Sequence, residues 1–313
     1  MDYRITHRTR YRYDEPVSLS YNLLLLSPRN TLFQSCSNFQ VRISPQASLL
    51  EERVDRFGNA GHYFEIHKPH KILTITATSD VTTRQSPLIQ PENSLPWDVA
   101  IQRIREDRDS DARLDRLFLL DSPMIKHTRS IEAFARESFP PGRPIVAAAL
   151  DLTARINREF SYTPGSTNIT TPLTEVMSTR QGVCQDFAHL QIACLRALGL
   201  PARYVSGYLE TQPPPGKARL VGVDASHAWL AIKIPDLGWI PLDPTNNMIA
   251  GERHIMVGWG RDYSDVAPIS GVIIGGSQHQ LEVSVDVRPI EKNQLSGNSQ
   301  HTSQPEFRDY QPI

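Results

Sequence analysis

Residues 180–242 read as one apolar helix followed by three strand-like runs. The helix covers 180–199, and Gly199 and Pro201 end it, as glycine and proline usually do. The strand-like runs cover residues 203–209, 227–234 and 239–242. This order predicts an α+β core in which the helix packs on an antiparallel sheet.

Residues 1–85 predict an N-terminal β domain. Between Tyr3 and Tyr13, alternate positions are polar, which is the period-two pattern of a half-buried strand. Short β-prone runs follow at 39–43, 62–66 and 72–77, with turn residues between them. Several short strands with turns of this kind predict an antiparallel β-sandwich.

Composition divides the rest of the chain into three parts. Prolines at 87, 91 and 96 open a helical linker region over 86–155, with amphipathic helices at 125–138 and 145–160. We assign 156–290 to the core domain, including a late strand at 281–287. The polar residues 291–313 predict a disordered tail.

Charge and hydropathy exclude several classes of partner. The net charge is -1 over 313 residues, without the basic excess expected of a nucleic-acid-binding protein. We interpret the four arginines between Arg4 and Arg12 as one solvated strand face, because Asp14 and Glu15 follow them at once. No segment approaches the roughly 20 apolar residues of a membrane span. We therefore expect no nucleic acid and no membrane as partners; the oligomeric state is not predicted.

The N-terminus and the cysteines indicate a compartment. No apolar run of the kind found in a secretory signal follows Met1. The three cysteines cannot all pair, so they suggest no disulfide framework. We predict a reducing cytoplasm, with a processed precursor as the alternative.

Cys184 is the candidate nucleophile, because it stands at the start of the apolar helix, two residues after Gly182. The unpaired N–H groups there and the helix dipole favour a thiolate over a thiol. The thiolate attacks a carbonyl carbon, and the same N–H groups can stabilise the resulting oxyanion. Cys194, in mid-helix, and Cys36 carry no such signal, and a small buried apolar residue is the alternative role for any free cysteine.

A thiol nucleophile needs a base, and His227 is the candidate. It opens a strand whose even positions form one apolar face, so His227 lies on the other face. Asp243 ends the next strand, where a carboxylate can accept the imidazole N–H and stabilise the imidazolium. Taken alone, His227 could be an ordinary surface or core histidine, and Asp243 could be a turn residue before Pro244. A cysteine at a helix start followed by this histidine and this aspartate is a much more specific pattern.

The length of the turn decides whether His227 and Asp243 meet. A symmetric four-residue loop at 235–238 pairs Asp243 with Leu230 and puts it on the opposite face from His227. A loop of odd length pairs Asp243 with Trp229 instead, diagonally from His227 and about 7 Å away between Cα atoms. The triad therefore requires an odd loop or a bulge.

Three blocks of sequence resemble the motifs of the transglutaminase-like superfamily. They are 181–186 (Gln-Gly-Val-Cys-Gln-Asp), 226–229 (Ser-His-Ala-Trp) and 239–245 (Trp-Ile-Pro-Leu-Asp-Pro-Thr). The resemblance is greatest to bacterial members, some of which are described as cysteine proteases. Residues 6–13 resemble the β domain that precedes the core in those proteins.

The resemblance implies a papain-like core, with Cys184 as nucleophile, His227 as general base and acid, and Asp243 orienting the histidine. It also implies an acyl-thioester formed on a peptide or protein substrate. An amine resolves the thioester by transamidation and water resolves it by hydrolysis, and both outcomes stay open. Animal transglutaminases carry tryptophan where this chain has Gln185, and they have calcium sites and additional domains, so a calcium-dependent cross-linker is not expected.

Three further residues are candidates for the cleft. Gln181 and Tyr162 are candidates for a second oxyanion donor beside the Cys184 N–H, with a packing or loop role as an equal alternative. Trp229 is a candidate to line or support the cleft, with core packing as the alternative. The loop at 211–217 is a candidate to gate access, or an inert surface turn.

Metal and phosphate sites are not predicted. The histidines at 62, 67 and 70 have spacings that fit no zinc motif, and the glycine cluster at 271–276 lacks the Lys-Ser/Thr of a phosphate loop. We expect no metal and no cofactor. A catalytically idle peptide-binding module is a rival to the enzyme, and acetyl transfer to arylamines ranks last.

Overall fold

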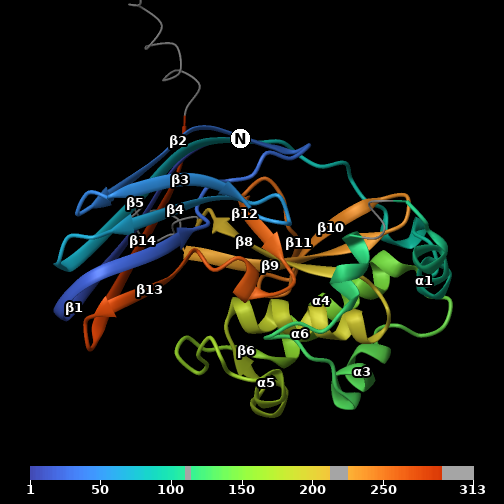
Figure 1. Ribbon diagram of the computed structural model, residues 1–313. Coiled ribbons are helices and arrows are strands. Elements are labelled where there is room, and N and C mark those ends of the chain that lie inside the picture. The colour runs from blue at the N-terminus through green and yellow to red at the C-terminus, as the bar shows by residue number, and fades with distance from the viewer. Residues whose placement is uncertain (110–113, 212–224, 291–313) are drawn as a thin grey trace, which may run out of the picture.

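The computed structural model describes residues 1–109, 114–211 and 225–290. An antiparallel β region lies beside a mixed core (Figure 1). The strands of the β region are β1 (Asp2–Leu24), β2 (Gln34–Ser44), β3 (Leu49–Val54), β4 (Ala60–Ile66), β5 (His70–Thr83), β13 (Ile269–Gly275) and β14 (His279–Pro289).

The core combines a five-stranded sheet with helices. Its strands are β8 (Ala202–Leu209), β9 (Ala225–Ile234), β10 (Gly238–Asp243), β11 (Met248–Ile249) and β12 (His254–Gly260), and a separate short pair is β6 (Ser161–Tyr162) with β7 (Gln181–Gly182). The helices are α1 (Trp97–Glu106), α3 (Arg129–Arg136), α4 (Ile145–Glu159), α5 (Leu173–Thr179) and α6 (Cys184–Ala197), with the 3-10 turns η1 (Pro91–Asn93), η2 (Arg116–Leu119) and η3 (Tyr263–Asp265).

β1 organises the β region because it is long enough to serve two halves of one sheet. Its first half pairs with β5 and β14, and its second half pairs with β4 and β13. Along the first half Tyr3 and Ile5 are buried and Arg4 and Arg8 are exposed, as the alternation predicts. The two halves share an apolar core that includes Phe64 of β4 and Leu73 and Ile75 of β5. The predicted antiparallel β architecture is confirmed.

The last two strands join the N-terminal sheet, whereas the sequence predicts their residues in the core domain. β14 pairs with β1 from Tyr3↔Pro289 to Tyr13↔His279. The glycine cluster at 271–276 lies in β13 and just after it. There a Cβ on Gly271 would come within 2.4 Å of the Tyr21 carbonyl oxygen, so glycine allows the two strands to approach. The domain boundaries otherwise remain a prediction.

The core sheet is the middle of three layers (Figure 1). Its order is β11-β10-β9-β8-β12. Leu230 of β9 and Leu190 of α6 belong to one apolar cluster on the helical face. A separate cluster joins Tyr208 of β8 to Tyr3 of β1 and Val287 of β14, so the core sheet also packs against the β region. The predicted α+β core, with the cysteine-bearing helix on an antiparallel sheet, is confirmed.

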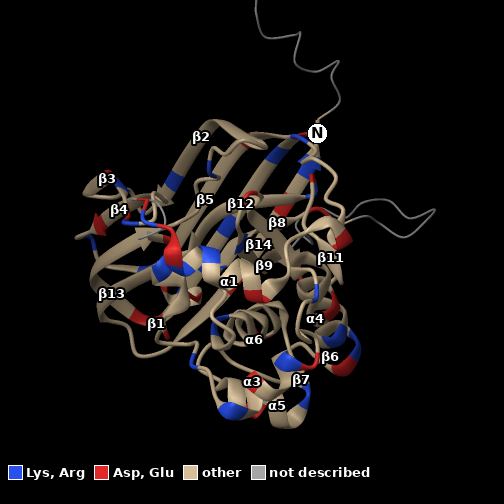
Figure 2. Ribbon diagram, turned by 90° about the vertical axis from the view of Figure 1, so that its right-hand side faces the viewer, with Lys and Arg blue, Asp and Glu red and all other residues tan. Residues whose placement is uncertain are grey.

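Figure 2 shows acidic and basic residues interspersed over strands and helices rather than gathered in one basic stripe. Arg4 and Arg12 are paired with Asp80 at 2.8 Å and with Glu282 at 3.2 Å. No described helix is long and apolar enough to cross a membrane. The partners and the compartment stay predictions. The tail at 291–313 and all but Thr211 of the 211–217 loop lie outside the described residues.

Candidate active site

α6 begins at Cys184 because the residues before it are held in an extended conformation and its first turn is capped. The cap is Asp186, whose Oδ2 accepts the Val183 N–H at 2.8 Å and the Thr167 hydroxyl at 2.6 Å. A Cβ on Gly182 would lie 2.9 Å from Cβ of Asp186, so glycine at this position leaves room for the cap. A carboxylate there also complements the positive end of the helix dipole. The half-buried Cys184 thiol therefore stands at a rigid helix start.

The hairpin of β9 and β10 has a three-residue loop, 235–237. Gly238 pairs with Ile234 and Leu242 pairs with Leu230, so the register continues toward Asp243 opposite Trp229. Asp236 and Gly238 adopt left-handed φ values of 65° and 78°, which allow so short a connection. This is the odd-length loop that the triad requires.

Asp243 consequently lies on the same face of the sheet as His227, and the two side chains are hydrogen-bonded. Nε2 of His227 lies 2.7 Å from Oδ2 of Asp243. The carboxylate is fully buried, and His227 is 8% exposed. The hydrogen bond between the two side chains is therefore shielded from water. A shielded hydrogen bond is stronger than one at the protein surface.

Asp243 accepts several other hydrogen bonds. Its Oδ1 accepts the backbone N–H groups of Thr245 at 2.9 Å and Asn246 at 3.2 Å, and its Oδ2 accepts the Asn246 side-chain amide at 2.6 Å. Burial alone would raise the pKa of Asp243, but the bonds from His227, His254 and Asn246 outweigh it and hold the pKa well below its usual range. The carboxylate is thus ionised when it faces His227.

His254 is a member of the site that the sequence analysis missed. Its Nδ1 accepts the Gly251 N–H at 3.3 Å, so its Nε2 carries the proton and donates to Oδ2 of Asp243 at 3.0 Å. It opens β12, a strand that pairs with β8 and lies at the edge of the sheet. No motif surrounds His254 in the sequence, and only the fold brings it to Asp243.

The surroundings of His227 favour the protonated, cationic form of its imidazole ring. Burial alone would lower the pKa of His227, but hydrogen bonds with Asp243 and with Cys184 outweigh it and raise the pKa to about 9. Because Nε2 is engaged by Asp243, Nδ1 is the nitrogen left to exchange a proton with the thiol of Cys184. The arrangement can hold an imidazolium beside a thiolate.

The three weaker candidates lie near these residues in different ways. Tyr162 pairs with Gly182 in the β6–β7 ladder, and burial and then the charge of Cys184 raise its pKa. Gln181, in the same ladder, is exposed. Trp229 is 1% exposed and stacks on His227 with ring centroids 5.9 Å apart, so it supports the imidazole from the core. The oxyanion roles remain predictions.

His227, Asp243 and His254 together present ligand atoms within 4.8 Å of one another, a set that metal ions also use. Here the protonated Nε2 of His254 is committed to Oδ2 of Asp243. We therefore interpret the group as a hydrogen-bond network around one carboxylate.

Two family models match this chain. Residues 3–82 match the bacterial transglutaminase-like N-terminal region, and residues 132–244 match the transglutaminase-like superfamily. The second match contains Cys184, His227 and Asp243.

Relatives extend the comparison over most of the chain. An uncharacterized protein of Mycobacterium tuberculosis is 44% identical over 301 residues, which are 94% of each chain. One of Mycobacterium leprae is 32% identical over 288 residues, 91% of this chain and 97% of that protein. A protein-glutamine gamma-glutamyltransferase of Pseudomonas aeruginosa is 35% identical over 129 residues, 40% of this chain and 19% of that protein.

A solved structure is similar to this chain along almost its whole length. It is the crystal structure of a "putative cysteine protease" from Cytophaga hutchinsonii, with a TM-score of 0.70 at 21% identity, covering 92% of this chain and 98% of that chain. The likeness shows the fold.

Proposed function

Because this chain belongs to the transglutaminase-like superfamily, we propose that it is a cysteine-nucleophile enzyme that forms an acyl-thioester on Cys184 from an amide. The observation that carries the proposal is the buried His227–Asp243 pair, joined at 2.7 Å, whose free ring nitrogen serves a thiol at a helix start. This arrangement supports the proposal, because covalent catalysis needs a nucleophile, a base and a carboxylate that orients the base.

The chemistry follows from these positions. The Cys184 thiolate attacks the amide carbon, and the oxyanion is held by the Cys184 N–H and one further donor. As the tetrahedral intermediate collapses, the C–N bond breaks and the His227 imidazolium gives its proton to the leaving nitrogen. The products of this half-reaction are an acyl-thioester, neutral His227 and a released amine or ammonia.

We propose that the thioester is then resolved by transfer to an amine, with a glutamine side chain as the acyl donor. His227 takes a proton from the amine as its nitrogen attacks, and the thiolate leaves. Support comes from the similarity to a protein-glutamine gamma-glutamyltransferase over 129 residues. Hydrolysis by water is the second candidate, because Cys184 is only half-buried and solvent can reach the thioester.

The test uses a fluorescent primary amine and a pool of glutamine-containing peptides, with wild type, Cys184→Ala and Cys36→Ser compared. Cys36 is also a half-buried free cysteine, but burial and then Asp80 raise its pKa to about 11, so it serves as a matched control. We expect amine incorporation in wild type and Cys36→Ser and none in Cys184→Ala.

Other outcomes separate the rivals. Release of ammonia or cleaved peptide without amine incorporation, when it depends on Cys184, selects hydrolysis. Equal signals in wild type and Cys184→Ala would exclude the proposed nucleophile. The absence of any Cys184-dependent turnover, together with no labelling of Cys184 by iodoacetamide at neutral pH, would favour a binding module.

A further inference from the structure

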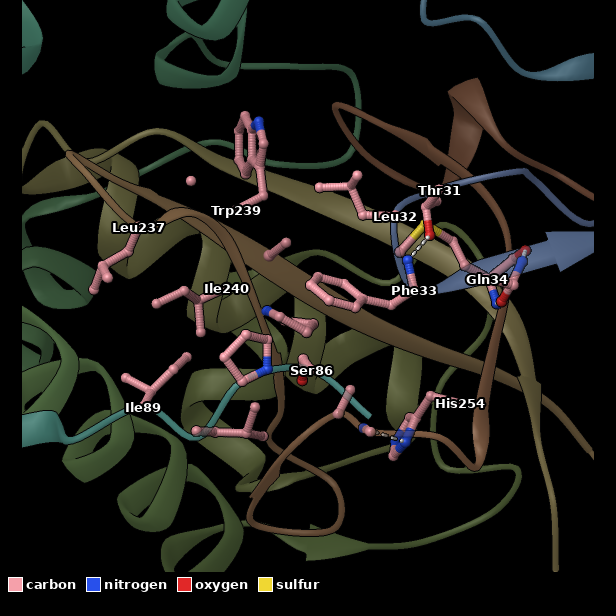
Figure 3. Close-up of a pocket in the computed structure, with 18 of the residues that line it drawn as sticks. Thr31, Leu32, Phe33, Gln34, Ser86, Ile89, Leu237, Trp239, Ile240 and His254 are labelled. Atoms are coloured by element: carbon pink, nitrogen blue, oxygen red, sulfur yellow. Dashed lines mark hydrogen bonds between the residues drawn. The ribbon is translucent and has the colours of Figure 1, made fainter. Parts of the chain in front are cut away.

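A cavity of about 780 Å³ lies on the face of the core sheet turned away from α6. Such a volume is within the range of small-molecule sites, roughly 300–1,000 Å³. Figure 3 shows side chains from three segments around it: Leu32 and Phe33 before β2, Ser86 and Ile89 after β5, and Trp239 and Ile240 of β10. Leu32 and Leu88 among the lining residues are 86% and 90% exposed, so an apolar ligand would cover them.

Arg203 of β8 contributes a buried guanidinium to this lining, which also includes exposed polar residues such as Arg84 and Gln90. Its guanidinium lies between two indoles, 4.2 Å from the ring centre of Trp239 and 3.7 Å from that of Trp259, and the residue is 9% exposed. Its Nε is buried without a hydrogen-bond partner, and within the described ranges no carboxylate pairs with it. Asp115, a nearby acidic residue, is paired with Lys233 at 2.7 Å.

The charge of Arg203 is therefore incompletely balanced. Burial and then Arg29 lower its pKa to about 9, and only Asp115 opposes them. A buried charge without a counter-charge is costly, and its ring contacts offset part of that cost. An anion in the cavity would supply the missing partner.

We propose that this cavity is a binding site for an aliphatic carboxylate, with the carboxylate on Arg203 and the hydrocarbon chain against Phe33, Leu237 and Ile240. A carboxylate matches the planar donor array of a guanidinium. We infer that the body of the ligand is a hydrocarbon, because the surface of the cavity walls is mostly apolar. A peptide would bring several backbone N–H and C=O groups to walls whose surface is mostly apolar, at a cost for each group left unpaired.

The cavity adjoins the proposed active site but does not contain Cys184. Among the described residues that line the cavity, Trp229 and His254 touch the catalytic network, whereas Cys184, His227 and Asp243 are not part of the lining. Binding can therefore be measured on the Cys184→Ala protein, and its outcome does not depend on whether the proposed reaction occurs.

The experiment is calorimetric titration of the Cys184→Ala full chain with decanoate, decanol and decyltrimethylammonium, three probes with one chain length and different head groups. We expect decanoate to bind and the other two to bind roughly tenfold to hundredfold more weakly. Quenching of tryptophan fluorescence by decanoate should report the same affinity, because Trp239 and Trp259 flank Arg203.

An Arg203→Met variant keeps much of the side-chain volume and removes the charge. It should lose the preference for decanoate over decanol, with an unchanged near-UV circular dichroism spectrum as the check on its fold. The head-group comparison on the parent protein stands if the variant does not fold. Equal binding of decanoate and decanol, no binding of decanoate, or unchanged decanoate affinity in folded Arg203→Met would overturn the proposal. Tighter Arg203-dependent binding of an apolar tripeptide with a free carboxylate than of decanoate would overturn the aliphatic assignment.

Discussion

The carboxylate of Asp243 is hydrogen-bonded to the imidazoles of both His227 and His254. The two rings differ in the partner of their second nitrogen. Nδ1 of His254 is occupied by the Gly251 N–H, whereas Nδ1 of His227 is left for the thiol. In the proposed reaction, His254 is thus a positioning residue that holds Oδ2 of Asp243, and His227 is the residue that moves protons.

The first prediction concerns pH. His227 must be protonated to act as the acid in thioester formation, and its pKa is raised to about 9, so kcat/KM should hold at neutral pH and fall as pH rises through about 9. Asp243→Asn removes a carboxylate that raises this pKa, so the basic limb should move to lower pH while the rate drops by roughly a hundredfold or more. A basic limb at the same pH in wild type and Asp243→Asn would contradict the assignment.

The second prediction concerns His254. His254→Leu removes one donor from a buried carboxylate and should lower the free energy of unfolding by about 1–3 kcal/mol. Because the freed carboxylate can shift, kcat should fall roughly tenfold with little change in KM. His254→Gln retains an N–H donor and should recover much of both losses. Urea unfolding and steady-state kinetics measure them, and equal defects in the two variants would rule out a positioning role.

At the level of elements, the helix and the hairpin that carry the motifs could be predicted, because the residues that determine each of them are close together in the sequence. The apolar helix ends at Ala197, two residues before the left-handed Gly199. The strands alternate, and the odd loop length sets the face on which Asp243 lies. The contribution of β12 was not predictable, because His254 reaches Asp243 only through the pairing of β12 with β8. The pairing of β14 with β1, more than 250 residues away in sequence, likewise leaves no local trace.

Gly207 of β8 gives a prediction at this scale. It pairs with His227, and a Cβ there would lie 2.1 Å from the Ile255 carbonyl oxygen and 2.5 Å from Cη2 of Trp229. The methyl group of Gly207→Ala should therefore displace both β12 and the indole that supports His227. We expect the free energy of unfolding to fall by about 1–3 kcal/mol and the activity to be reduced. Thermal unfolding measures the loss. Gly251→Ala, where an added Cβ meets nothing within 4 Å, is the matched control and should stay near wild-type stability.

At the scale of the whole molecule, the chain closes on itself. Its first and last strands pair, and Tyr3, Val285 and Val287 pack on Tyr208 of the core sheet. The Tyr3 hydroxyl also donates to Glu210 at 2.9 Å. We infer that the β region and the core support each other, so that damage to the last strand should reach the active site.

Two substitutions on β14 test this coupling. Val285 is 1% exposed and Val283 is 52% exposed on the same strand. Val285→Asp buries an unpaired charge and should lower stability by more than about 3 kcal/mol, with loss of activity in the same thermal transition. Val283→Asp should remain within about 0.5 kcal/mol of wild type. Full activity in a destabilised Val285→Asp protein would show that the two regions are independent.

The central claim is that Cys184 carries the acyl group. Intact-protein mass spectrometry after acid quenching of a reaction with a glutamine donor peptide, without added amine, tests it most directly. We predict an adduct with the mass of the peptide less ammonia, located on Cys184, removed by hydroxylamine and absent from Cys184→Ala. An adduct that persists in Cys184→Ala, or wild-type turnover without any adduct on Cys184, would contradict it.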